Sequence, residues 1–184
     1  MLNAARALLA EATTYTAFTV DAVAKRADVA RATVYYQFHS KTGLLEALCD
    51  DLAEAGGMGD LGHVFAEPDP QEALHGFIAT FGRFWAADRL VMRRLRALAA
   101  LDADVHAVVT ARDEGRRQGL QILVGRLSGQ AGGLSVSLDD AVRVLQALTS
   151  FETFDSLAGA DGDLADAAPL INTLAAAWIT GSAR

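Results

Sequence analysis

The chain contains a single cysteine, Cys49, and only three prolines in 184 residues. One cysteine excludes an internal disulfide framework and fits a reducing compartment, so we expect a cytoplasmic protein in which Cys49 is a small apolar filler. No stretch approaches the roughly 18 to 20 apolar residues of a membrane span. The amino terminus also lacks the basic start and cleavage pattern of a signal peptide.

Enzyme signatures are missing as well, because neither GxSxG, HExxH nor a P-loop occurs. Glu72 and His75 have the E-x-x-H spacing with which helix bundles hold iron, and Asp60 and His63 echo it faintly. A di-iron site needs two such motifs and two further inward glutamates, and only Glu152 is expected near a core. We predict no catalysis, no metal and no cofactor, with a helical-bundle metal enzyme as the unfavoured alternative.

An overall excess of positive charge is also absent, since the net charge is -7. Residues 1–49 hold five basic and four acidic residues, net +1, whereas the remaining 135 hold 11 and 19, net -8. The asymmetry directs the amino-terminal part toward nucleic acid. We expect few phosphate contacts per subunit and an affinity that needs two subunits together.

Two short helical patterns lie between Thr19 and Lys41. Thr19 is the expected N-cap of the first, in which Val20, Val23 and Ala24 repeat at helical spacing. Residues 28–29 form the turn, and the second pattern covers 30–38. Two helices joined by a turn this short form the unit whose second helix can enter the major groove of DNA.

The second helix places Val34 and Phe38 on one face and polar side chains on the others. Arg31 can donate two hydrogen bonds to guanine, and Tyr35 and Tyr36 can reach phosphate or a base edge. Lys41 opens the next helix behind Ser40, its expected N-cap, where a cation and free amides can hold a phosphate. The alternative is an aromatic corner of a core with solvated charges around it.

The stretch FTVDAVAKRADVARATVYYQFHSKTGLLEAL, residues 18–48, resembles the DNA-binding domain of the tetracycline-repressor (TetR) family of bacterial regulators. The resemblance covers roughly the first 48 residues. It implies base-reading places at Arg31, Ala32, Thr33 and Tyr36, and backbone-contacting places at Thr19, Tyr35, Gln37 and Lys41.

Two residues depart from the family pattern. Asp28 stands where a turn glycine is usual, and an aspartate tolerates the left-handed conformation better than most residues. Ala30 stands where a serine or threonine usually caps the recognition helix. Losing that cap costs about 1 kcal/mol unless Asp28 substitutes for it.

The periodicity predicts an all-α protein with two domains. Residues 1–48 are the expected three-helix DNA-binding domain with its helix-turn-helix, and 49–184 a helical effector-binding and dimerisation domain. A connecting helix should run from Lys41 to about Ala55, and the glycine-rich stretch 56–62 should be a flexible boundary. The chain starts almost on its first helix, so we expect no minor-groove contact from a preceding basic arm.

The second domain reads as helical from Gln71 onward, opened by Asp69 as N-cap and Pro70 at the first position. Helices are expected near 71–87, 89–100, 104–129, 139–158 and 164–179. Pro169 should kink the last helix or delay its start. The last two helices are apolar on more than one face, which predicts a homodimer through a four-helix bundle. The alternative is that both bury against the central helix.

Aromatic and methionine side chains at helical spacing indicate either a core or a pocket between helices. The resemblance favours a pocket for a small hydrophobic effector. The residues expected to line it or to orient the ligand are His75, Phe81, Trp85, Met92, His106, Arg112 and Phe151.

Together these features predict a ligand-responsive transcriptional regulator, a repressor that binds a pseudo-palindromic operator as a homodimer and is released by its effector. The alternative is a DNA-binding architectural protein without an effector. Equal DNA affinity with and without any ligand would distinguish it.

Overall fold

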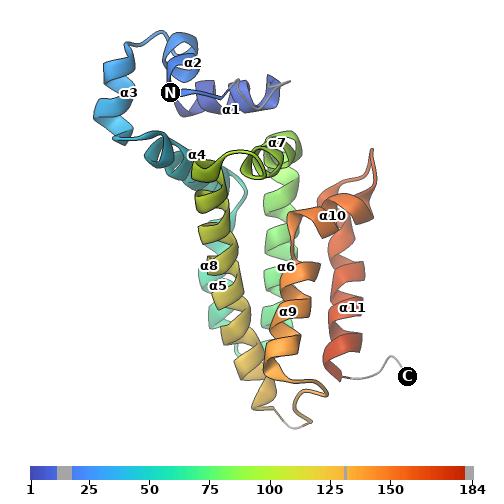
Figure 1. The fold of residues 1–184 in the computed structure, drawn as a ribbon. Helices are drawn as coiled ribbons and strands as arrows, with labels where there is room; N and C mark the ends of the chain where they lie inside the picture. Colours follow the sequence, from blue (N-terminus) through green and yellow to red (C-terminus); the bar gives the residue numbers. More distant parts are fainter. Residues whose placement is uncertain (12–17, 131, 181–184) are drawn as a thin grey trace. The chain divides into compact units, whose positions relative to one another are not determined.

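The computed structural model describes residues 1–11, 18–130 and 132–180, and these form helices without any strand (Figure 1). The predicted all-α fold is therefore confirmed. The α-helices are α1 (Leu2–Glu11), α2 (Val20–Arg26), α3 (Arg31–Phe38), α4 (Lys41–Ala55), α5 (Leu61–Ala66), α6 (Pro70–Ala87), α7 (Arg89–Ala99), α8 (Ala103–Ser128), α9 (Leu138–Leu148), α10 (Phe151–Ala158) and α11 (Ala168–Thr180). Two short 3-10 helices are η2 (Met58–Asp60) and η3 (Leu164–Ala167).

The helices pack as two compact units, each assembled from two segments of the chain. Unit 1 comprises Met1–Ala55 and Asp88–Arg112, and unit 2 comprises Gly56–Ala87 and Asp113–Arg184. Helix α8 is continuous, so its first ten residues belong to unit 1 and the rest to unit 2. The predicted boundary after residue 48, between a DNA-binding domain and an effector-binding domain, is not tested by this division into packing units and stays a prediction.

Unit 1 is built around fully buried aliphatic side chains. Its core contains Leu9 of α1, Val23 of α2, Val34 of α3, and Leu44 and Leu48 of α4. Helix α1 packs against α2 and α4, and α3 packs against the same two helices. Helix α1 also packs against α7. Cys49 is buried in this unit, and burial raises the pKa of its thiol to about 11, which fits the predicted role as an apolar filler.

Unit 2 is built around α6, which contacts α5, α10, η3 and α11. Its aromatic residues form a continuous buried cluster. Phe77 and Phe81 lie 4.7 Å apart between ring centroids, and Phe81, Trp85 and Phe151 continue the cluster at steps of 5.8 Å. The start of α6 is as predicted, because the side chain of Asp69 accepts a hydrogen bond from the amide of Gln71 at 2.8 Å.

Three segments differ in detail from the sequence-based expectations. The stretch 56–62 is not simply a flexible boundary, because η2 and the first residues of α5 lie within it. The expected helix 139–158 is two helices, α9 and α10, that break at Thr149 and Ser150. Pro169 does delay the last α-helix, which begins only at Ala168 after η3. No helix among the described residues is long and apolar enough to cross a membrane.

Candidate nucleic-acid interface

The first helix of the motif, α2, begins and ends with hydrogen bonds that the local sequence explains. Thr19 caps its start, accepting a hydrogen bond from the amide of Ala22 at 3.1 Å. At its end the amides of Asp28 and Val29 donate to the carbonyls of Lys25 and Ala24 at 3.3 and 3.0 Å, the bond pattern of a Schellman cap. Asp28 takes the left-handed conformation there, at φ 53°, so the aspartate does form the turn.

The recognition helix α3 starts without a side-chain cap. Ala30 is extended at the N-cap position and only its carbonyl takes part, accepting from the amide of Thr33 at 2.9 Å. The amides of the first turn therefore have no acceptor on the N-cap side chain. At the far end, His39 adopts φ 63° and the chain turns directly into Ser40, which caps α4 through the amide of Gly43 at 2.9 Å.

The two faces of α3 separate as the sequence predicts. Val34 is 1% exposed and Phe38 is buried, and they fix the helix to α2 and α4. All the other residues of α3 are exposed, and Tyr36 is the extreme case at 87%. An exposed tyrosine ring of this kind gains nothing for the fold, so the structure leaves the ring free for a partner.

Arg31 is held along the surface of α3. Its guanidinium lies 3.2 Å from a carboxylate oxygen of Asp21 and donates to the Tyr35 hydroxyl at 3.2 Å. It also lies 5.3 Å from the centroid of the Tyr35 ring. The hydrogen bond with Tyr35 and the charge of Asp21 raise the pKa of Arg31.

Lys41, the predicted phosphate contact, has an intramolecular partner in unit 1. Its ammonium is bound to the carboxylate of Asp102, just ahead of α8, and both side chains are 24% exposed. This hydrogen bond holds the pKa of Asp102 below its ordinary value. Sequence reasoning missed Asp102, since 61 residues separate it from Lys41 and no local pattern joins them.

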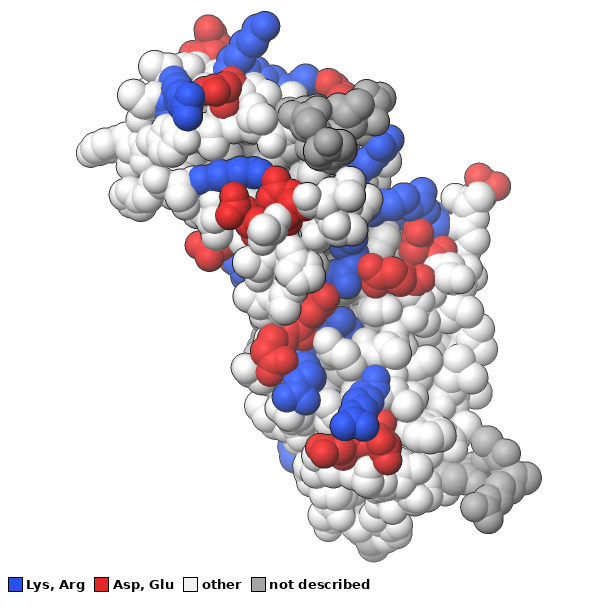
Figure 2. All heavy atoms as spheres, viewed as in Figure 1, with Lys and Arg blue, Asp and Glu red and all other residues white. Residues whose placement is uncertain are grey.

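Two further cations of α1 and α2 have intramolecular partners as well. Arg26 makes two hydrogen bonds to Glu11 at 2.6 and 2.7 Å, and Arg6 is bound to Asp88. In Figure 2, Lys and Arg stand beside Asp and Glu over α1 to α4 instead of gathering into a patch of one sign. Arg6, Arg26, Arg31 and Lys41 are therefore each held by a carboxylate of the same chain.

The seven residues predicted to contact a ligand fall into different environments. Phe81, Trp85 and Phe151 are buried in the aromatic cluster of unit 2, where Trp85 also donates to the carbonyl of Thr149 at 3.1 Å. Met92 is buried in unit 1. His106 and Arg112 also belong to unit 1 and are exposed on α8. Arg112 lies 2.7 Å from a carboxylate oxygen of Asp50 and donates to the carbonyl of Glu46 at 3.3 Å.

His75 borders a hollow within unit 2. One part, of about 70 Å³, is lined mainly by apolar side chains with His75 and Asn172 at its wall. The adjoining part, of about 260 Å³, shares four lining residues with it. The amide oxygen of Asn172 is buried and has no hydrogen-bond partner among the described residues.

His75 and Glu72 lie 3.8 Å apart on the surface, and no group of three or more His, Cys, Asp or Glu side chains suited to a metal occurs in the described ranges.

Helix α11 presents an uncharged outer face. It contains no Asp, Glu, Lys or Arg, and its exposed side chains include Leu170, Leu174 and Trp178. Leu157 of α10 is exposed as well. The surface over α11 is correspondingly free of charged side chains in Figure 2. By contrast Val142, Leu145, Leu164 and Ile171, on other faces of these last elements, are buried within the chain.

Comparison with known proteins places these features in context. Residues 1–48 match the family model described as bacterial regulatory proteins, tetR family. No curated protein matches the chain. The fold is similar to that of the TetR-family transcriptional regulator PfmR of Thermus thermophilus, at 19% identity and a TM-score of 0.69, covering 95% of each chain.

Two further solved structures of similar fold are complexes with a small molecule. The transcriptional regulator FadR of Bacillus subtilis, in complex with stearoyl-CoA, is 21% identical with a TM-score of 0.70 and 97% of each chain covered. A putative transcriptional regulator of Saccharomonospora viridis, in complex with choline, is 16% identical with a TM-score of 0.63, covering 95% of this chain and 91% of that one. At these identities the likeness concerns the fold.

Proposed function

Because residues 1–48 carry the DNA-binding domain of the tetR family of bacterial regulatory proteins, and the fold is that of TetR-family transcriptional regulators, we propose that the chain represses transcription. It would do so by binding a pseudo-palindromic operator as a homodimer. The observation that supports DNA reading most directly is the exposed face of α3. Val34 and Phe38 anchor the helix while Tyr36 extends into solvent. A rigid helix with a free polar face suits the major groove.

The exposed side chains divide by what they can reach. Arg31, Thr33 and Tyr36 would contact base edges, with Ala32 close to a thymine methyl. Tyr35, Gln37 and Lys41 would contact the phosphate backbone, together with the hydroxyl of Thr19, which can still donate while its oxygen caps α2. A contact of Arg31 with a base edge competes with Asp21 and Tyr35, which engage its two terminal nitrogens.

The uncharged outer face of α11 supports the proposed dimer. Exposed leucines and a tryptophan on a helix without charges are costly in water and are covered when two copies meet about a two-fold axis. Two copies would present two α3 helices to successive major grooves, about 34 to 36 Å apart.

For the effector we propose the hollow of unit 2 bordered by His75 and Asn172. The part of about 70 Å³ has largely apolar walls, and the unpartnered amide oxygen of Asn172 lies in one of its lining residues. The part of about 260 Å³ also has Gln71, Gln130 and Ser135 in its lining. The volume is at or below the lower end of the roughly 300–1,000 Å³ of common ligand pockets, which favours a small molecule with an apolar part and a few polar groups. The aromatic cluster around Phe81 and Trp85 is packed as core, so these two residues would line a ligand only after rearrangement.

Selection of bound duplexes from a random DNA pool by the purified protein tests the central proposal. We expect enrichment of a palindromic sequence whose half-sites lie one turn of DNA apart or somewhat more. Enrichment of no sequence, or of a sequence without a dyad, would contradict it. The selected duplex can then be challenged with choline and with stearoyl-CoA, the ligands of two structures of this fold. Release by choline would agree with a small effector, whereas release by stearoyl-CoA would contradict the proposal drawn from the volume of the hollow.

A further inference from the structure

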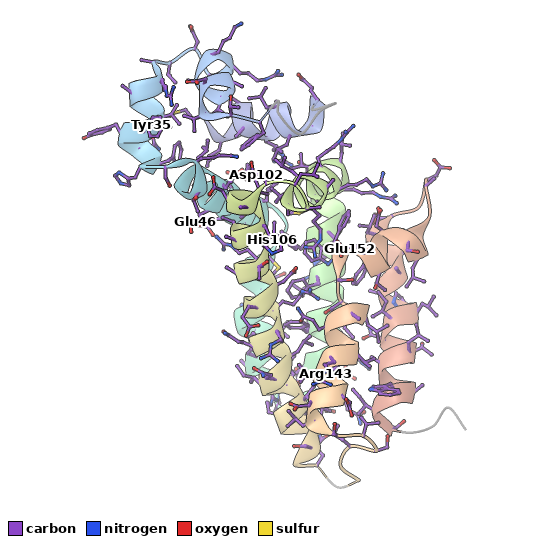
Figure 3. The ribbon with its side chains drawn as sticks, viewed as in Figure 1. Tyr35, Glu46, Asp102, His106, Arg143 and Glu152 are labelled. Atoms are coloured by element: carbon purple, nitrogen blue, oxygen red, sulfur yellow. The ribbon has the colours of Figure 1, made fainter. Side chains whose placement is uncertain are left out.

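Asp102 uses its two carboxylate oxygens for different purposes. Oδ1 accepts hydrogen bonds from the amides of Asp104 and Val105, at 3.0 and 3.2 Å, and so caps the start of α8. Oδ2 holds the ammonium of Lys41, the first residue of α4. Figure 3 shows Asp102 where the chain enters α8, beside α4. One side chain thus joins the cap of a helix to a cation of the DNA-binding domain.

The same arrangement occurs once more in unit 1. Asp88 caps α7 by accepting from the amide of Val91 through Oδ1 at 3.3 Å, and its Oδ2 holds the guanidinium of Arg6 in α1. The two cases differ in the cation. Arg6 is not among the candidate DNA contacts, whereas Lys41 stands at the capped start of α4, where a phosphate would be held.

A second contact keeps α4 and the first part of α8 in register. Arg112 donates to the carbonyl of Glu46 at 3.3 Å and lies 2.7 Å from a carboxylate oxygen of Asp50. Together with the Lys41–Asp102 pair, it holds α4 to α8 at two places about two turns apart. The carboxylate of Asp102 therefore stays beside Lys41 as long as both helices keep their positions.

We infer that Asp102 competes with operator phosphate for Lys41 and thereby sets the affinity for DNA; this inference rests on the proposed function. A phosphate that binds Lys41 must either displace the carboxylate or lie next to it, and two anions beside one ammonium repel each other. The carboxylate of Asp102 thus occupies the position beside Lys41 that an operator phosphate would take. Because the same carboxylate caps α8, a shift at the start of α8 alters the competition and so changes DNA affinity.

Asp102→Asn tests the competition directly. Asparagine caps helices about as well as aspartate, so the substitution removes the charge that holds Lys41 while an amide oxygen remains for the amides of α8. We expect the variant to bind a duplex selected from a random pool about two- to fivefold more tightly than the wild type, the range expected for a partly exposed ion pair. Fluorescence anisotropy at one fixed salt concentration measures this difference.

Two matched variants separate the competition from other effects. Asp104 is exposed and lies two residues after Asp102. Asp104→Asn removes an equal negative charge, and it should change the DNA affinity much less than Asp102→Asn does. In a Lys41→Met background the Asp102→Asn substitution should have no further effect, because the contested ammonium is gone. If circular dichroism shows that the Asp102→Asn protein is not folded, Asp102→Ser replaces it as the test. Serine keeps an uncharged oxygen that can cap α8.

The outcomes separate this inference from the proposed function. A wild-type protein that binds no duplex would refute the proposed function before Asp102 is considered. A wild-type protein that binds, with an Asp102→Asn variant that binds equally or more weakly, would overturn the competition. The weaker binding would instead show that Asp102 positions Lys41 for the phosphate.

Discussion

Asp28 adopts a backbone conformation that favours glycine. At φ 53° an L-residue pays roughly 1–2 kcal/mol, less for aspartate than for most, whereas glycine enters this region freely. We expect Asp28→Gly to be more stable than Asp28→Ala by about 1 kcal/mol in urea unfolding. The variants remove the same charge, so the difference reports the turn alone. Equal stability of the two would show that the turn relaxes to another conformation.

Asp102 makes stability depend on acid pH in a defined direction. Its pKa lies below the ordinary 3.8 chiefly because Lys41 donates to the carboxylate. The unfolded state therefore takes up this proton at a higher pH than the folded state, and the contribution, complete above the unfolded pKa, is lost as the pH falls through the folded pKa. We expect the free energy of unfolding to fall more steeply for wild type than for Asp102→Asn below about pH 4.

Urea unfolding at several pH values between about 6 and 3 checks this expectation, because both proteins share every other carboxylate. Parallel curves for the two proteins would mean that the Lys41–Asp102 pair contributes nothing to the fold. That result would leave the competition for phosphate to be judged by DNA binding alone.

Among the helices, α3 offers the clearest separation of folding from recognition. Tyr36→Ala removes a ring that is 87% exposed, so the free energy of unfolding should change by less than about 0.5 kcal/mol. Its affinity for the selected duplex should fall by about 1–3 kcal/mol, the value of a good base contact. Val34→Ala, on the buried face, should instead cost about 2 kcal/mol of stability.

Thermal unfolding and anisotropy titration of both variants provide the comparison. Normal DNA binding by Tyr36→Ala would remove this residue from the recognition surface. A loss of stability comparable to that of Val34→Ala would show that the ring packs against the protein.

The helices that sequence reasoning located well have signals within their own residues. Thr19, Ser40 and Asp69 were identified as caps, and each accepts the expected amide hydrogen bond. The periodicity of Val34 and Phe38 likewise gave the buried face of α3. Such features depend on neighbours within one or two turns, and a single sequence contains them.

The features that were missed depend on residues far away in the chain. The carboxyl end of α5 is held by Arg126 of α8, which donates to the carbonyls of Phe65, Glu67 and Pro68. The carbonyl of Gln146 near the end of α9 accepts from the buried Arg116 at 2.7 Å, which also donates to Thr149 at 2.8 Å. These contacts satisfy backbone carbonyls that a helix end or a helix break would otherwise leave open. No local sequence pattern predicts them, and the pairing of Lys41 with Asp102, 61 residues away, was missed for the same reason.

Across the whole molecule, charge is distributed so that DNA binding requires exchange of partners. Unit 1 holds ten basic and ten acidic residues, net zero, and unit 2 holds six and 13, net -7. In this neutral unit Arg26, Arg31 and Lys41 are already paired, so each of them gains a phosphate contact at the expense of a carboxylate contact. Electrostatic attraction over distance should therefore be weak, and specific contacts by two subunits must supply most of the affinity.

The dimer proposal leads to a test at this scale. Leu174 is exposed on the uncharged outer face of α11, and Leu174→Glu would place a carboxylate within the proposed interface. We expect this variant to sediment as a monomer and to bind the full palindrome at least ~100-fold more weakly, because linked half-sites contribute about 10²- to 10⁴-fold in avidity. Analytical ultracentrifugation and anisotropy titration measure the two effects.

Ile122→Glu is the matched control, because Ile122 is an equally large and exposed apolar residue on α8, outside the face of α11. It should remain dimeric and bind DNA like the wild type. A Leu174→Glu protein that stays dimeric would place the interface elsewhere and remove the reason for the exposed leucines of α11. A monomeric variant with unchanged operator affinity would be more informative still, since it would show that one recognition helix suffices and that the pairing of half-sites is not how this chain reads DNA.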